Sequence, residues 1–192
     1  MKTMDKQREL DKVAEDIARR EVCLSLSKNC TNPVPGDGSP DADIMFIGEA
    51  PGKQEDLEGK PFVGAAGKFL AEMLEGIKLT RDDVYITNIV KYRPPENRDP
   101  TPEEIKECLP FLVRQIKIIQ PKLIVLLGRH AMNVFFPNFR ISQVHGKPVR
   151  MKNQVYMPLF HPAAALYNGS MRETLIEDFN KIPQILEKIN SN

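Results

Sequence analysis

The stretch Gly48-Glu49-Ala50-Pro51-Gly52-Lys53-Gln54-Glu55-Asp56 decides how this sequence is interpreted. It follows the short apolar run Ile44-Met45-Phe46-Ile47, which is typical of a buried β-strand. A buried strand that ends in a loop with glycines and carboxylates places polar groups at the carboxyl edge of a sheet, where open α/β folds bind ligands. The following segment, Gly59-Lys60-Pro61-Phe62-Val63-Gly64, holds one aromatic residue among glycines and a proline. We interpret it as a shaped wall of that site.

The length and charge of the chain limit its class. With 192 residues it can bury one sizeable core, so we expect a single domain over residues 1–192, with an N-terminal helix (1–22) packed on it. The net charge of +1 means that a nucleic-acid partner would need a local basic patch. No apolar run approaches the ~20 residues that span a bilayer, and the first ten residues lack a signal-peptide core. We therefore expect a cytoplasmic monomer with no membrane partner.

Strand patterns alternate with helix patterns along the chain. Apolar runs rich in β-branched residues predict strands at 44–47, 84–90, 123–127 and 155–160. Apolar periodicity predicts helices at 5–21, 65–76, 102–120 and 129–136, and a last helix that starts at Ser170 and is interrupted at Pro183. Parallel neighbours need helical crossovers, so this order predicts a three-layer α/β/α fold with a mostly parallel four-stranded sheet.

Distinctive polar or glycine residues lie at the end of every predicted strand. They are, in chain order, Glu49, Asn88, Gly128 and His161. The carboxyl ends of parallel strands meet at one edge of a sheet, so we expect these segments to converge on one crevice.

Several motifs in a fixed order resemble those of the family 4 uracil-DNA glycosylases. They are GEAPGKQED with GKPFVG, YITNIVKYRPPENR, ECLP, LLG and FHPAAAL, and they extend from about Pro33 to Leu166. An ordered set of motifs is strong evidence, whereas a single GxxPG would be weak. The resemblance implies a uracil-DNA glycosylase-like fold. It also implies a DNA repair enzyme that hydrolyses the N-glycosidic bond of deoxyuridine in DNA, releases uracil and leaves an abasic site.

The resemblance assigns three residues to a flipped uracil. The amide of Asn88 would pair with uracil O4 and N3–H, and cytosine presents the reverse pattern at those atoms. His161 would donate a hydrogen bond to uracil O2, which a neutral imidazole can do. Phe62 would stack on the base. Each residue also has a simpler interpretation: a turn asparagine, a satisfied loop histidine and a core phenylalanine.

Two carboxylates and two small residues complete the implied site. Glu55 would occupy the space of the thymine 5-methyl group, although it could be a solvated charge. Backbone N–H groups of the Ala50 region would stabilise negative charge on the departing base, and Pro51 would line the uracil site. Glu49 would hold the attacking water and face the positively charged sugar. The alternative for Glu49 is a carboxylate bound by N–H groups of its own loop, and the sequence does not separate the two.

Contact with DNA requires cations that neutralise phosphates. The candidates are Lys91, Arg93, Arg98 and Lys147, each of which could also be an ordinary surface charge. Leu166 could fill the gap left by the extruded base, or it could belong to the first turn of a packed helix.

The cysteines depart from the family pattern. The resemblance implies a 4Fe–4S cluster held by four cysteines, but only Cys108, in ECLP, has a clear match. Tyr92 stands at the third ligand position, and Leu26 stands where a CxxC pair with Cys23 would need a thiolate. Cys30 does not restore that spacing. We expect no cluster, with packing around Tyr92 in its place; the alternative is a cluster with an incomplete cysteine set.

Two rival functions remain. The protein could bind uracil-containing or damaged DNA without cleaving it, although Glu49, Asn88 and His161 are all present. It could also act on free nucleotides, which the absence of a GxxxxGK phosphate loop disfavours. His145, where the family usually has an arginine, is a further departure that could weaken a phosphate contact.

Overall fold

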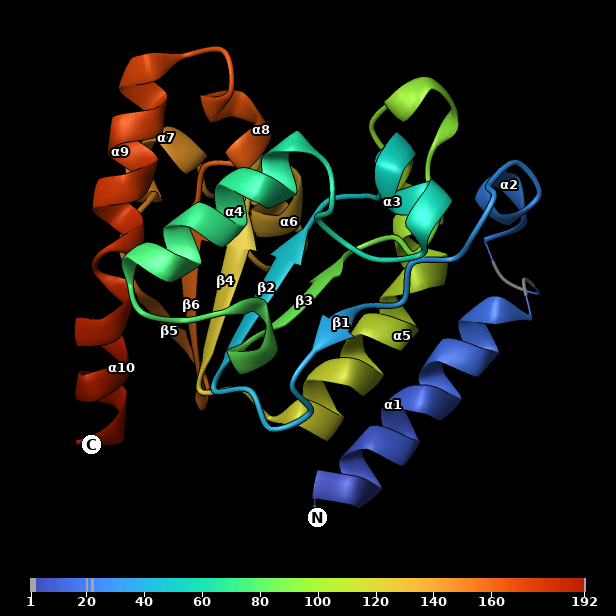
Figure 1. The fold of residues 1–192 in the computed structure, drawn as a ribbon, viewed down its shortest axis with the longest axis horizontal. Helices are drawn as coiled ribbons and strands as arrows, with labels where there is room; N and C mark the ends of the chain where they lie inside the picture. The colour runs from blue at the N-terminus through green and yellow to red at the C-terminus, as the bar shows by residue number, and fades with distance from the viewer. Residues whose placement is uncertain (1–2, 20, 22, 192) are drawn as a thin grey trace.

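The computed structural model describes residues 3–19, 21 and 23–191. Its centre is a sheet of six strands in the order β1-β3-β2-β4-β6-β5 (Figure 1). The strands are β1 (Asp37–Gly38), β2 (Ile44–Gly48), β3 (Tyr85–Asn88), β4 (Leu123–Leu127), β5 (Val149–Met151) and β6 (Gln154–Leu159). Strands β3, β2, β4 and β6 are parallel neighbours, while β1 and β5 pair antiparallel at the two edges.

Helices cover both faces of this sheet, which confirms the predicted three-layer α/β/α class. They are α1 (Thr3–Ala18), α2 (Leu24–Ser27), α3 (Lys53–Glu58), α4 (Ala65–Gly76), α5 (Pro102–Ile119), α6 (Arg129–Phe135), α7 (Ile141–Val144), α8 (Pro162–Ala165), α9 (Gly169–Phe179) and α10 (Ile182–Asn190), with 3-10 turns η1 (Arg81–Asp83) and η2 (Pro95–Asn97). None of the helices in the described ranges has the length and apolar character needed to cross a bilayer.

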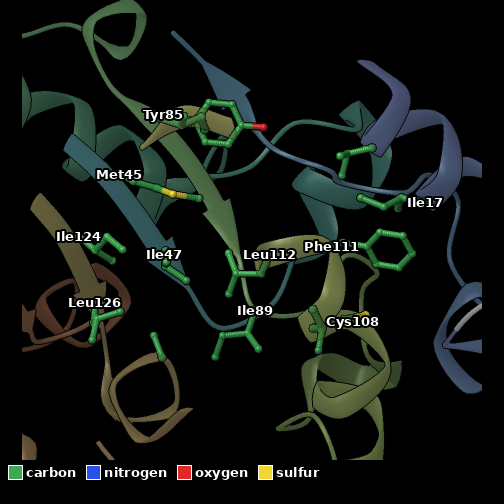
Figure 2. Close-up of a cluster of buried hydrophobic side chains, with 14 of the residues drawn as sticks. Ile17, Met45, Ile47, Tyr85, Ile89, Cys108, Phe111, Leu112, Ile124 and Leu126 are labelled. Carbon is green, nitrogen blue, oxygen red and sulfur yellow. The ribbon is translucent and has the colours of Figure 1, made fainter. Parts of the chain in front are cut away.

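The two faces of the sheet follow from the alternation of side chains along each strand. In β2, Met45 and Ile47 join the core formed with α1, α5 and α6, part of which is drawn in Figure 2. Ile44 and Phe46 point to the opposite face and join the core formed with α4, α9 and α10. A continuous apolar strand is therefore buried on both sides, as a parallel strand between two helix layers should be.

The start of α5 shows how local sequence sets an element. Thr101 Oγ1 accepts a hydrogen bond from Glu104 N (3.3 Å), and Glu104 Oε2 accepts one from Thr101 N (2.8 Å). This is the capping box expected from the sequence, with Pro102 at the first helical position. The helix ends at Ile119, and its C-cap Gln120 has a left-handed backbone (φ 56°) and precedes Pro121.

Some sequence-based boundaries were wrong. The sheet has six strands rather than four, because short edge strands carry little sequence signal. In β1, Gly38 (φ +121°) lies so close to β3 that a Cβ would sit 2.0 Å from Val84 O. The last helical segment is capped by Asn168, whose Oδ1 accepts from Met171 N (3.2 Å), and not by Ser170. Its interruption near Pro183 is confirmed, since α10 begins at Ile182.

Candidate active site

A cavity with a volume of about 350 Å³ lies at the carboxyl ends of the parallel strands. It brings together Glu49 after β2, Asn88 at the end of β3 and His161 after β6. Its further lining residues are Ala50, Pro51, Gly52, Glu55, Phe62, Ala66, Pro94, Asn97, Arg98, Asp99 and Ala163. Gly128 is not among the lining residues but lies next to His161, because a Cβ added there would be 3.1 Å from the Cβ of His161. The volume is at the lower end of the range for small-ligand pockets.

Asn88 carries an unpaired polar atom at the wall of this cavity. Its side chain is 2% exposed, and Oδ1 has no hydrogen-bond partner among the described residues. Leaving a buried acceptor unpaired costs about 1–3 kcal/mol. The interpretation of Asn88 as a turn residue is not supported, because a turn would use this oxygen. Gly48 makes room for it, since a Cβ there would lie 2.4 Å from Asn88 Oδ1.

Phe62 forms one wall in a strained backbone conformation. Its φ is +53°, which is uncommon for a bulky residue. The Arg81 guanidinium holds this conformation by donating to the carbonyl oxygens of Pro61 (2.7 Å) and Phe62 (2.9 Å). The ring is 6% exposed, and its centroid lies 5.6 Å from that of His161. The sequence did not indicate the part played by Arg81, which lies 19 residues away.

Glu55 fixes the same loop from the other side. Its Oε1 accepts from the backbone N–H groups of Val63 (3.0 Å) and Gly64 (2.9 Å), and its Oε2 accepts from Gly52 N (3.1 Å). Glu55 is therefore not a plain solvated charge. These three hydrogen bonds hold its carboxylate at the cavity wall.

Glu49 has a different environment. No loop N–H donates to its carboxylate within the described part of the chain, so the loop-binding alternative describes Glu55 instead. Its side chain is 25% exposed, and Oε2 lies 3.9 Å from His130 Nε2. Burial raises the pKa of Glu49 above its usual 4.5; the charge of His130 lowers it, and that of Asp99 raises it.

His161 is oriented by the helix that it begins. It is the N-cap of α8, and its Nδ1 accepts a hydrogen bond from Ala163 N (3.1 Å). The neutral ring therefore carries its proton on Nε2 and can donate from there. Burial lowers the pKa of His161 to about 4, the negative charge of Glu55 opposes this shift, and His130 adds to it. The imidazole is neutral at physiological pH.

Two further charged or titratable side chains, Asp99 and His130, lie beside Glu49, and the sequence did not indicate their part in the site. Candidate ligand atoms of Glu49, Asp99 and His130 lie within 4.8 Å of one another, a spacing that could suit a cation. Arg129, however, places its Nε 2.9 Å from His130 Nε2 and its Nη2 3.4 Å from Asp99 Oδ2. The exposed Arg129 guanidinium therefore places a positive charge beside these groups, so we do not interpret them as a metal site.

Lys91 is not a DNA contact, and that expectation was wrong. The residue is fully buried, and its Nζ donates to Thr87 Oγ1 (2.7 Å), Asn88 O (2.8 Å) and Gln115 Oε1 (2.8 Å). These contacts use all three ammonium hydrogens. The side chain turns inward beneath the strand end that carries Asn88, where burial lowers its pKa to about 7.

The remaining DNA candidates differ in their environments. Lys147 is exposed, and Arg93 is partly buried and donates to Asn97 Oδ1 (2.8 Å). Arg98 forms two hydrogen bonds, 2.7 and 2.8 Å, with the carboxylate of Glu104, so its charge is already paired. Leu166 packs partly buried against the core of α4, α9 and α10, as in the packed-helix alternative.

His145 has a structural environment. Its Nδ1 lies 2.5 Å from Oδ2 of Asp178, a carboxylate that is 3% exposed, and its ring packs 4.6 Å from that of Phe160. The residue pairs a buried charge. This contact does not involve a phosphate site.

The cluster positions implied by the resemblance belong to one buried core but do not fit a four-thiolate site. Cys23, Leu26, Tyr92 and Cys108 are all fully buried. A hydrogen bond between the two thiols raises the pKa of Cys23 and lowers that of Cys108. Leu26 offers no ligand atom, and the Tyr92 hydroxyl donates to Ile17 O (2.5 Å). Cys30 is occupied elsewhere, with its Sγ 3.4 Å from Ser27 O.

Comparison with known proteins gives one consistent family. The sequence profile of the uracil DNA glycosylase superfamily matches residues 35–186. The chain is 50% identical to the type-4 uracil-DNA glycosylase of Sulfurisphaera tokodaii, over 92% of this chain and 84% of that one. It is 48% identical to the type-4 enzyme of Archaeoglobus fulgidus, over 93% and 94% of the two chains, and 41% identical to that of Thermotoga maritima, over 94% and 96%.

Proposed function

We propose that this chain, which belongs to the uracil DNA glycosylase superfamily, hydrolyses the N-glycosidic bond of deoxyuridine in DNA and leaves an abasic site. The observation that carries the proposal is the buried, unpaired Oδ1 of Asn88 at the wall of a cavity sized for a small ligand. The type-4 uracil-DNA glycosylases with 41–50% identity support the reaction. The substrate is uracil-containing DNA.

Recognition of uracil rests on the polarity of Asn88. Oδ1 accepts the uracil N3–H, and Nδ2 donates to O4. Cytosine presents an acceptor at N3 and a donor at N4, so both contacts become repulsive and the buried groups lose their partners. A site built to hydrogen-bond one ligand rejects an analogue that leaves its polar groups unpaired.

The walls of the cavity select the shape of the base. Phe62, held by Arg81, stacks on the pyrimidine face, which contributes about 1–3 kcal/mol. Glu55 fills the space beside C5, so the methyl group of thymine clashes with a carboxylate that three backbone hydrogen bonds hold in place. Specificity therefore combines a hydrogen-bond pattern with steric exclusion.

Hydrolysis needs a positioned water and a stabilised leaving base. Glu49, whose carboxylate accepts from no loop N–H among the described residues, holds the water beneath C1′ and faces the oxocarbenium-like sugar. The Nε2–H of His161 and backbone N–H groups near Ala50 stabilise the charge that develops on uracil O2. His161 acts as a neutral donor, in keeping with the hydrogen bond that its Nδ1 accepts.

The same proposal excludes a role for an iron–sulfur cluster. Two of the four family ligand positions hold Leu26 and Tyr92, so no step passes through such a group. Purified protein should be colourless and contain no iron or sulfide. The double variant Leu26→Cys with Tyr92→Cys restores the ligand pattern, and we expect it to take up iron during reconstitution. Stoichiometric iron and sulfide in the wild-type protein would overturn this part of the proposal.

A cleavage assay tests the reaction. The protein is incubated with single- and double-stranded oligonucleotides that contain one uracil, followed by alkali cleavage at abasic sites. We expect strand cleavage at the uracil position and none at thymine or cytosine. Retention of DNA without cleavage would favour a binding protein, and indifference to DNA would favour an enzyme of free nucleotides.

A further inference from the structure

Two buried thiols meet where the N-terminal segment contacts helix α5. Cys23 directly precedes α2, and Cys108 lies in the second turn of α5; both side chains are fully buried. Cys23 Sγ donates a hydrogen bond to Glu104 O (3.5 Å), the carbonyl one helical turn before Cys108. A further hydrogen bond joins the two thiols. The two sulfur atoms are therefore neighbours, although the residues lie far apart in the sequence.

The backbone around Cys23 is held in an uncommon conformation. Its φ of 53° and ψ of 45° place a residue other than glycine in the left-handed region. The Cys23 carbonyl accepts from Leu26 N and Ser27 N (2.9 Å each), and both of these residues are buried. Ser25 Oγ donates to Glu104 Oε1 (3.0 Å). The turn is therefore docked on the start of α5, which fixes the position of the thiol.

A second cavity, with a volume of about 660 Å³, has Cys23 in its wall, whereas Cys108 is not among its lining residues. Four glutamates and a single arginine provide the charges of this wall: Glu21, Glu103, Glu104, Glu107 and Arg98. The arginine is already paired with Glu104 (2.7 Å). The excess of carboxylates favours a small cationic reagent over an anionic one. Such a reagent would reach Cys23 before Cys108.

We propose that Cys23 and Cys108 are an oxidation site, at which a small disulfide compound converts the two thiols into an intramolecular disulfide. The Cys23 thiolate attacks the reagent, releases one of its halves as a thiol and forms a mixed disulfide. The Cys108 thiolate then attacks the Cys23 sulfur and releases the second half. The two protons lost by the cysteines end on the two released thiols, and the electrons given up by the protein sulfurs reduce the reagent. Under reducing conditions the pair stays as two thiols.

The bond would link the N-terminal segment covalently to α5. Cys23 precedes β1 and Cys108 follows β3, so the closed loop contains three strands of the sheet. In the chain-entropy account, cross-links that close long loops restrict the unfolded chain most. Oxidation should therefore stabilise the fold. Neither cysteine lines the cavity that holds Asn88, so the inference does not depend on the proposed function.

The test compares wild-type protein with the variants Cys23→Ala, Cys108→Ala and Cys30→Ala. Each is incubated with cystamine, a small cationic disulfide, which is then removed. Free thiols are titrated in denaturant, and disulfides are located by mass spectrometry of peptides prepared without reductant. We expect wild type and Cys30→Ala to lose two thiols, to yield the Cys23–Cys108 peptide pair and to melt about 5–15 °C higher than before treatment. Dithiothreitol should reverse these changes.

The single variants separate the two steps. Cys108→Ala should stop at a mixed disulfide between Cys23 and the reagent, and Cys23→Ala should show no rise in melting temperature. Melting under reducing conditions establishes that each variant is folded before treatment. Oxidised glutathione, which is anionic, should react more slowly than cystamine.

Three results would overturn the inference: a disulfide that includes Cys30, a disulfide between two molecules, or a wild-type protein that keeps both thiols free. Cleavage of a uracil oligonucleotide, measured before and after treatment, should be unchanged by oxidation. If cleavage is absent in both states, the proposed function fails, while formation of the Cys23–Cys108 peptide pair still supports the oxidation site.

Discussion

Two regions next to the end of β3 differ in whether their buried polar atoms have hydrogen-bond partners. Asn88 faces the cavity, with a buried oxygen that has no partner among the described residues. Four residues later, Tyr92 is fully buried in the core that contains residues of α1 and α5, and its hydroxyl donates to Ile17 O. The region around Asn88 therefore contains a buried acceptor without a donor, while in the region around Tyr92 the side chains are packed and the hydroxyl is hydrogen-bonded.

This difference separates a binding site from a packing site. An unpaired buried acceptor lowers the stability of the fold unless a ligand supplies a donor. The cavity is therefore suited to a ligand that donates a hydrogen bond to Asn88 Oδ1. The Tyr92 region, for which the sequence resemblance implied metal ligands, instead holds buried side chains that pack together. Variants in the first region should change activity, and variants in the second should change stability.

The largest effect is expected for Asn88→Ala. It removes both hydrogen bonds to the base, so kcat/KM on uracil-containing DNA should fall about 10³-fold. Thermal stability should not fall, because the oxygen that is lost has no partner among the described residues. Asn153→Ala, at an exposed asparagine, serves as the control and should change neither quantity. A large loss of stability in Asn88→Ala would show that the side chain is structural.

A smaller loss is expected for Glu49→Gln, about 10²-fold or more in kcat, with uracil-DNA binding retained. The water would lose its carboxylate partner, while the base contacts remain. Wild-type turnover should also fall with decreasing pH through the pKa of Glu49, which burial places above 4.5, because the ionised form is the active one. The variant should lack this acid limb in a pH–kcat profile. Unchanged turnover in Glu49→Gln would eliminate the catalytic role.

The sequence predicted these two regions unequally. The central strands and the start of α5 were predictable because their signals are local: an apolar run, or Thr101 followed by Pro102 and Glu104. The convergence of Glu49, Asn88 and His161 was predictable because parallel strands end at one edge. Local sequence patterns therefore predicted the strands, and the parallel topology predicted that their ends meet at one site.

Residues whose surroundings depend on distant segments were not predictable. Lys91 follows a strand and precedes a proline loop, so it resembled a surface cation. Its burial depends on Gln115, 24 residues away, which supplies an acceptor inside the fold. Arg81 and His130 likewise act on groups far along the chain. Their contacts depend on tertiary packing. The periodicity of a single sequence indicates local structure and does not indicate which distant residues come into contact.

Lys91 lies between Asn88 and Tyr92 in the sequence. From its lowered pKa we expect the free energy of unfolding to depend on pH, with an effect of intermediate size. Its pKa of about 7 in the folded protein is below the 10.5 of an exposed lysine. Between these values the unfolded chain binds more protons, so the free energy of unfolding should rise with pH, by at most about 1.4 kcal/mol per pH unit. Lys91→Met should lack this rise. Urea unfolding of both proteins at pH 7 and pH 9 measures it, and an equal change in the free energy of unfolding between the two pH values in both proteins would contradict the lowered pKa of Lys91.

The smallest effect is expected for Tyr92→Phe, and it tests the second region most directly. The carbonyl of Ile17 is one of the last in α1, where the helix supplies no N–H partner, and the Tyr92 hydroxyl takes that place. Removing the hydroxyl should lower the free energy of unfolding by about 1–2 kcal/mol. Tyr167→Phe, which loses an exposed hydroxyl, should change it by less than about 0.5 kcal/mol. Cleavage by Tyr92→Phe at a temperature where it is fully folded should equal that of wild type. If activity fell without a loss of stability, the Tyr92 region would belong to the catalytic machinery, and the division between a region that binds and a region that packs would fail.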